Sequence, residues 1–260
     1  MSFGLLFAFT YTHNPILSIA GFGTGALAVS LLKRGKRHTA KPALQVRADD
    51  SRPPILLLRN FADDFLTVHR SQTINPLKWW QNKLFAGQTT TLEEVVAEEL
   101  MQFGPVIAVA KPRRGLPPAG FARLWLDDEW KEVVGELMVE AQLVVIIVGQ
   151  IHGTTDGFGW ELQQLLRNVR PDRVVFVVPP VKPWGDKSED YWKAFRRQSE
   201  GKLDMEVDHS TPLLTFLPNG KLKALGGRRL NDADYRKALG ELISMKRNML
   251  GTNPDSIGSD

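Results

Sequence analysis

The chain has 260 residues, of which 43% are hydrophobic, as is typical of a globular protein with one sizeable core. It contains no cysteine, which excludes disulfides, thiolate metal sites and cysteine nucleophiles. Residues 1–42 hold five of the 33 Lys and Arg and none of the 29 acidic residues, so the remainder is nearly neutral, which argues against a nucleic-acid binder that needs a basic face.

The first predicted element is residues 15–32, which carry no charged side chain. At about 1.5 Å per residue, this segment is just long enough to cross a bilayer core of roughly 30 Å. The basic cluster KRGKRH follows it at once, so the positive-inside rule predicts an N-terminus outside and a domain in the cytoplasm. We therefore expect residues 1–37 to be a transmembrane anchor with a basic flank. The alternatives are a buried core helix or a signal peptide cleaved after Ala26-Leu27-Ala28, although no Lys or Arg precedes that segment.

The next segment, residues 38–53, is polar, contains proline and shows no periodicity, so it predicts a linker. Beyond it, four short and continuous apolar runs predict parallel strands that are buried on both faces. These runs cover residues 55–58, 106–110, 143–148 and 174–178.

Helical patterns separate these runs. Apolar residues recur at helical spacing along 127–141, and Thr91 followed by Glu94 has the capping-box spacing at the start of a helix over 92–101. Because strands and helices alternate, we predict an α/β fold, a doubly wound, flavodoxin-like parallel sheet of about five strands with helices on both faces, preceded by one N-terminal transmembrane helix.

Three other segments complete the chain. Residues 65–90 form an unusually long connection, which is either a packed insertion helix or a segment that lies on the membrane surface. Residues 216–225 carry an Asn-Gly turn signal between apolar segments. We expect a closing helix over 231–249 and a disordered tail over 251–260.

Ligands of a doubly wound sheet bind beyond the carboxyl ends of its strands. After the third apolar run, a glycine-rich loop over 149–159 leads directly into Trp160 and Glu161. The apolar stripe that follows leaves Glu161 outside it, so we expect this carboxylate in the first turn of a helix, ionised and facing the mouth of the cleft. It is suited to stabilising an oxocarbenium-like ribose, and helix capping is its alternative role.

The segments ILLLRNFADD, EEVVAEELMQFGPVIAVAKP and VVIIVGQIHGTTDGFGWELQQLL resemble a TIR-like domain (Toll/interleukin-1 receptor/resistance) of the bacterial membrane-associated branch. The resemblance covers about residues 54–180 of a domain that we place at 54–250, with a C-terminal extension over 181–250. In that family, a glutamate that opens the helix after the third strand is the catalytic residue of NAD hydrolysis, and Glu161 falls there. The implied substrate-binding residues are Arg59, Asn60, Phe61, Asp63 and Trp160.

The resemblance implies a membrane-anchored NAD hydrolase of the bacterial inner membrane, activated by self-association in antiphage defence or signalling. NAD would be its substrate rather than a cofactor, with neither a metal nor a nucleic acid as partner. One alternative is a TIR-like interaction module without catalysis. Another is an N-glycosidase related to nucleoside deoxyribosyltransferases, because DGFGWEL resembles their DxGTxxELG signature. The sequence contains no GxxxxGK[ST] or HExxH motif.

Overall fold

The structure is a computed structural model. It describes residues 43–59, 66–69, 89–110, 122–125, 130–148, 157–180, 192–193, 195–197, 199, 202–203, 210–227 and 230–251. The predicted anchor and the predicted C-terminal tail beyond residue 251 lie outside these ranges. Within them, no helix combines the length and the hydrophobicity needed to cross a bilayer.

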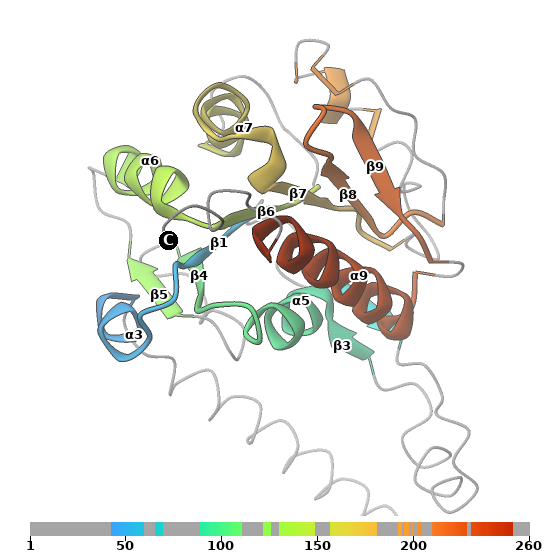
Figure 1. The fold of residues 1–260 in the computed structure, drawn as a ribbon, viewed down its shortest axis with the longest axis horizontal. Helices are drawn as coiled ribbons and strands as arrows, with labels where there is room; N and C mark the ends of the chain where they lie inside the picture. Colours follow the sequence, from blue (N-terminus) through green and yellow to red (C-terminus); the bar gives the residue numbers. More distant parts are fainter. Residues whose placement is uncertain are drawn as a thin grey trace, which may run out of the picture.

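A seven-stranded sheet in the order β5-β4-β1-β6-β7-β8-β9 forms the centre of the structure (Figure 1). Its five parallel strands are β1 (Ile55–Arg59), β4 (Val106–Ala110), β5 (Ala122–Trp125), β6 (Leu143–Ile147) and β7 (Val174–Val177). The last two strands, β8 (Leu213–Phe216) and β9 (Leu222–Leu225), are antiparallel. The four predicted runs are thus four neighbouring strands, and the prediction of a mixed α/β fold with a mostly parallel central sheet is confirmed.

Helices cover both faces of this sheet, as predicted. Helices α6 (Trp130–Glu140) and α7 (Gly157–Asn168) lie on one face, and α5 (Leu92–Leu100) and α9 (Asp232–Gly251) lie on the other (Figure 1). Each face has its own core, because successive strand residues point in opposite directions. In β1, Leu56 packs on the α6 and α7 side, whereas Ile55 and Leu57 pack on the α5 and α9 side.

Several local predictions are also confirmed. The capping box is present at the start of α5, where the side chain of Thr91 accepts from the backbone N–H of Glu94. The Asn-Gly turn joins β8 to β9, with Gly220 at a φ of 77°. The ends of the long 65–90 connection were not predicted as strands, but they pair as a two-stranded sheet, β2 (Thr67–His69) with β3 (Thr89–Thr91). The rest of the predicted insertion, residues 70–88, lies outside the described residues. The predicted C-terminal extension continues the central sheet with β8 and β9 and covers one face of it with α9.

The predicted linker differs from the structure. Within residues 38–53, helix α3 (Ala43–Asp49) packs against the domain instead of forming an irregular tether. Ala43 is 5% exposed in the core, and Arg47 pairs with Glu140 of α6 at 2.6 Å. The physical reason is a short apolar stripe, Ala43 and Val46, which the polar composition of the segment concealed.

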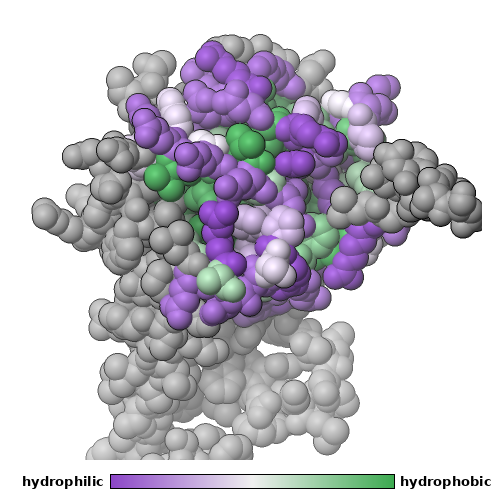
Figure 2. Space-filling view, turned by 60° about the vertical axis from the view of Figure 1, so that its left-hand side comes forward, coloured by the Kyte–Doolittle hydropathy of each residue, from purple (hydrophilic) through white to green (hydrophobic). Residues whose placement is uncertain are grey.

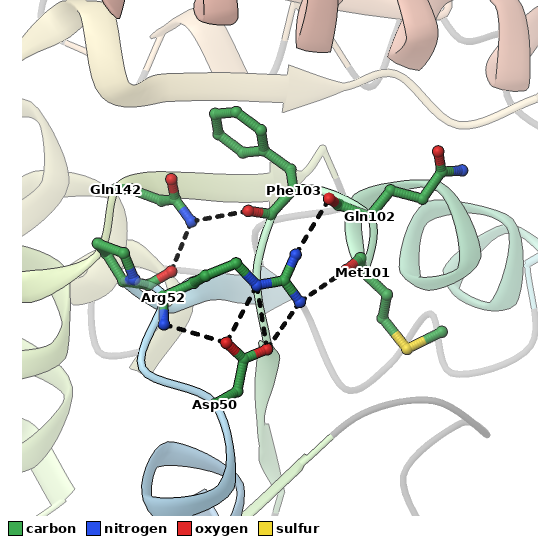
Figure 3. Close-up of polar contacts among 7 residues, drawn as sticks. Asp50, Arg52, Met101, Gln102, Phe103 and Gln142 are labelled. Atoms are coloured by element: carbon green, nitrogen blue, oxygen red, sulfur yellow. Dashed lines mark hydrogen bonds and ion pairs between the residues drawn. The ribbon is translucent and has the colours of Figure 1, made fainter.

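The chain enters the sheet through a cluster of polar contacts at the amino ends of the strands (Figure 3). Arg52 donates to the carboxylate of Asp50 at 2.7 Å and to the carbonyl oxygens of Met101 and Gln102 at the end of α5. Beside it, Gln142 donates to two further backbone carbonyls. This amino-edge cluster satisfies carbonyls at the end of α5 and lies at the edge of the sheet opposite the expected ligand site.

Figure 2 brings forward the side of the molecule that carries α3, β5 and α6. The described surface on this side is mostly hydrophilic, with small hydrophobic areas between polar side chains. Among the described residues, the exposed large hydrophobic side chains are Met101 at 39% and Val139 at 61%. Single exposed apolar residues of this kind are ordinary on a protein surface.

Candidate functional site

The strand order reverses next to β1. The chain passes from β1 through α5 to β4 on one side, whereas β6 lies on the other side of β1. In open α/β sheets, ligands bind at this reversal, outside the carboxyl ends of the two strands. Here these ends are Arg59 and Ile147, which are direct register partners. The candidate site is therefore built around the carboxyl ends of β1 and β6.

Glu161 lies in α7, the helix that follows β6. Because α7 begins at Gly157, Glu161 is its fifth residue and lies past the first turn, which contains no acidic residue. At a rise of 1.5 Å per residue, it lies about 6 Å along the helix from its start. The structure therefore keeps Glu161 near the carboxyl edge of the sheet, as expected, but not at the helix N-terminus.

Glu161 is only 4% exposed, so it is buried rather than outside the apolar stripe as the sequence predicted. It lies on the buried face of α7 together with Phe158, Leu162 and Leu165, at positions i, i+3, i+4 and i+7 of one helical stripe. The sequence prediction began that stripe at Leu162 and read DGFG as loop. Gly157 and Gly159 are helical, however, and this extends the stripe back to Phe158 and includes Glu161.

A carboxylate in this position has a defined chemical capacity. Burial removes water, so its charge acts over a low effective dielectric on any cation that develops nearby. Fixed charges of this kind stabilise transition states without having to reorganise. A buried carboxylate is better suited to stabilising a positive charge than to binding a hydroxyl group in a solvent-exposed position.

Arg59 occupies its predicted place at the end of β1, but its guanidinium forms an ion pair with Glu93 in the first turn of α5. The two side chains are 9% and 6% exposed. Strand alternation explains the direction, because Arg59 follows Ile55 and Leu57 on the α5 and α9 face. Arg59 and Glu161 therefore approach the reversal from opposite faces of the sheet. Sequence reasoning missed Glu93, whose signal was a second glutamate beside the capping residue Glu94.

Trp160 packs against the neighbouring helix. Its ring meets that of Trp130 edge to face, with centroids 5.1 Å apart and an interplanar angle of 78°. The ammonium of Lys131 lies 5.6 Å from the ring centroid of Trp160 and 5.8 Å from that of Trp130. Both tryptophans are half-buried. Trp130 belonged to the predicted helical stripe, whereas no sequence signal paired it with Trp160.

Three predicted ligand-binding residues, Asn60, Phe61 and Asp63, lie outside the described residues. Over the described part of the chain, no group of three or more His, Cys, Asp or Glu side chains could hold a metal ion. The described candidate site therefore consists of Glu161, the Arg59 and Glu93 pair, and the two tryptophans with Lys131.

No protein-family model matches the sequence, and no curated protein matches it significantly. One similar solved structure is the C-terminal domain of the coenzyme A biosynthesis bifunctional protein CoaBC. The similarity covers 78% of this chain and 100% of that chain, with 12% identity and a TM-score of 0.35. A likeness at this TM-score carries no argument about fold or activity, so any function must be argued from the residues themselves.

Proposed function

We propose that this protein is a membrane-anchored, TIR-like NAD hydrolase, with a flavodoxin-like sheet, that cleaves the bond between nicotinamide and ribose, and that Glu161 is its catalytic residue. One observation carries the proposal. A carboxylate only 4% exposed lies near the start of the helix that follows β6, at the strand-order reversal. The resemblance of the surrounding sequence to TIR-like domains supports the same position.

The chemistry needs a fixed negative charge at this point. When the N-glycosidic bond breaks, its electron pair leaves with nicotinamide, which becomes neutral, and positive charge develops on the ribose. Glu161 stabilises that charge from a water-poor position. Water then adds to the anomeric carbon and releases a proton, which gives ADP-ribose. No metal and no further cofactor takes part in these steps.

The proposed cellular setting rests on the N-terminal sequence and on the resemblance to bacterial TIR-like domains. Residues 15–32 span the bacterial inner membrane once, and the basic flank holds the domain in the cytoplasm. Self-association in the plane of the membrane activates the enzyme in defence or signalling. Membrane fractionation tests the anchor, because deletion of residues 1–37 should move the protein from the pellet to the supernatant.

A second candidate is a TIR-like interaction module without catalysis. A specific observation favours it, since two expected ligand-binding side chains are engaged within the domain. Arg59 pairs with Glu93, and Trp160 packs against Trp130. A domain that only associates with other copies needs no open pocket at the reversal.

Nicotinamide release distinguishes these functions. The full-length protein is reconstituted into liposomes at increasing surface density and supplied with NAD or with a deoxynucleoside. Release of nicotinamide that rises more steeply than density supports the proposed hydrolase. Self-association without cleavage of either compound supports the interaction module, and cleavage of the deoxynucleoside alone supports the deoxyribosyltransferase-like alternative.

A further inference from the structure

Two tryptophans and a lysine form a cluster at the starts of α6 and α7. Packing between the helices does not by itself account for the lysine. Trp130 is the first residue of α6, Lys131 follows it, and Trp160 is the fourth residue of α7. The two rings contact each other edge to face, and the ammonium of Lys131 lies within 5.8 Å of both ring centroids. We refer to these three residues as the tryptophan-lysine cluster.

The tryptophan-lysine cluster lies at the edge of the sheet where ligands bind. Helix α6 follows β5 and helix α7 follows β6, so both helices begin at the carboxyl ends of parallel strands. The two helices contact each other on the same face of the sheet (Figure 1). Gly157 permits this proximity, because a Cβ there would lie 3.3 Å from the ring of Trp130. Glu161 directly follows Trp160 in α7, so the cluster and this carboxylate belong to the same end of the helix.

The exposure of these side chains differs from that of core aromatics. Trp192 is 1% exposed, whereas Trp130 and Trp160 are half-buried and Lys131 is exposed. Packing between two helices requires apolar contact but no cation. A lysine that lays its stem along aromatic rings keeps its ammonium in water, where it can attract an anion. The cluster thus combines aromatic surface with positive charge, the two features that recognise a nucleotide.

We propose that the tryptophan-lysine cluster binds the adenosine diphosphate half of NAD, with the tryptophan rings against adenine and the Lys131 ammonium on the pyrophosphate. This inference rests on the proposed function, because it takes NAD as the substrate at Glu161. The nicotinamide ribose must lie next to Glu161, so the rest of the dinucleotide extends away from that carboxylate. Neighbouring packed helices are about 8–10 Å apart, which places α6 within reach of the extended part.

The distribution of positive charge around the site supports an adenosine diphosphate half that extends from Glu161 towards α6. Arg59 lies on the opposite face of the sheet and is paired with Glu93, so its positive charge is already balanced. Lys131 lies on the same face of the sheet as Glu161. Its ammonium lies over the rings of Trp130 and Trp160. An ammonium at the rim of a site binds phosphate as a point charge, and a tryptophan ring stacks on any base.

Direct binding of ADP tests the inference independently of catalysis. The probe is radiolabelled ADP, measured by equilibrium dialysis against the full-length protein in detergent micelles at low ionic strength. We expect wild-type protein to bind ADP, and Lys131→Gln to weaken binding about tenfold, while Lys131→Arg retains most of it. Trp130→Leu should also weaken binding about tenfold through the loss of one aromatic ring from the adenine contact. The control is Lys237→Gln, an exposed lysine of α9 on the opposite face, which should bind ADP as wild type does.

Lys131 is exposed, so Lys131→Gln leaves the core intact and its result does not depend on whether Trp130→Leu folds. Absence of ADP binding by wild type, or equal binding by wild type and Lys131→Gln, overturns the inference. If ADP binding depends on Lys131 but the protein never releases nicotinamide, the ADP site stands and the hydrolase is overturned. If the protein releases nicotinamide and Lys131→Gln has the wild-type KM for NAD, the hydrolase stands and the ADP site is overturned.

Discussion

Arg59, the last residue of β1, and Glu93, in the first turn of α5, form an ion pair whose two side chains are 9% and 6% exposed. The pair joins the sheet to the helix at the strand-order reversal. An exposed ion pair contributes little to stability, whereas breaking a buried pair leaves one charge without compensation in a low dielectric. The pair should therefore matter to folding even if no ligand ever binds beside it.

We predict that Glu93→Ala lowers the free energy of unfolding by about 3 kcal/mol, because it leaves the Arg59 charge buried without its carboxylate. Urea unfolding followed by circular dichroism measures the loss. The matched control is Glu98→Ala, whose side chain is 55% exposed and pairs with Arg236, and there the loss should stay below about 1 kcal/mol. Equal losses in the two variants would show that the buried pair has no special role.

Gly104 is predicted to be intolerant of a side chain. A Cβ at this position would lie 2.7 Å from the carbonyl oxygen of Pro53, the same oxygen that accepts from Gln142 at 2.5 Å in the amino-edge cluster. Gly104→Ala should therefore lower the free energy of unfolding by about 1–3 kcal/mol. Gly135→Ala in α6 is the control, since nothing lies within 4 Å of its Cβ and alanine favours a helix by up to about 1 kcal/mol. The two substitutions should shift the urea midpoint in opposite directions.

Tyr235 gives a pH-dependent prediction. Its hydroxyl donates to the carbonyl oxygen of Val178 at 2.6 Å, and burial, with a smaller contribution from the charge of Asp234, raises the pKa of Tyr235 well above its ordinary value of 10.0. Above pH 10 the unfolded state loses this proton while the folded state keeps it, so the unfolding free energy should fall as pH rises beyond 10. Tyr235→Phe should remove that part of the decline and cost about 1 kcal/mol at neutral pH. An identical alkaline decline in both proteins would contradict the assignment.

The sequence was sufficient to predict the strands in the middle of the sheet but not the strands at its edges. Strands β1, β4, β6 and β7 are buried on both faces, so each is a continuous apolar run that can be recognised alone. Strand β5, with the sequence ARLW, is short and contains an arginine, and only its pairing with β4 defines it. Helix α3 was missed because its apolar stripe, Ala43 and Val46, is too short to be recognised in a polar segment without the packing on β5 and the ion pair with α6.

The places of the candidate residues in the fold were predictable, but their contacts were not. The apolar runs predicted where two of the strands end, and the structure has Arg59 at the end of β1 and α7 after β6. The partner of Arg59 lies 34 residues away, beyond a long connection, and no local pattern identifies it. Glu161 belongs to the buried stripe because α7 begins at Gly157 and includes Gly159. Glycine is unfavourable in a helix, so the sequence predicts a loop for both glycines.

Burial also changes what is expected of substitutions at Glu161. If this residue lay exposed in a first helical turn, its removal would cost little stability. At 4% exposure, Glu161→Ala should lower the free energy of unfolding by about 1–3 kcal/mol, because it leaves a cavity and removes a buried polar partner. Glu161→Gln keeps the volume and should preserve the fold more closely, which makes it the appropriate variant for a test of catalysis.

The most direct measurement is nicotinamide release from NAD by full-length wild-type protein and by Glu161→Gln, both displayed on liposomes at the same density. We predict that wild type releases nicotinamide and that Glu161→Gln is slower by a factor of about 100 or more, since the amide no longer supplies the negative charge that stabilises the ribosyl cation. The melting temperatures of the two proteins should remain close. Equal rates of nicotinamide release by wild type and Glu161→Gln would contradict the assignment of Glu161, and a wild-type protein that releases none at any density would contradict the proposed hydrolase itself.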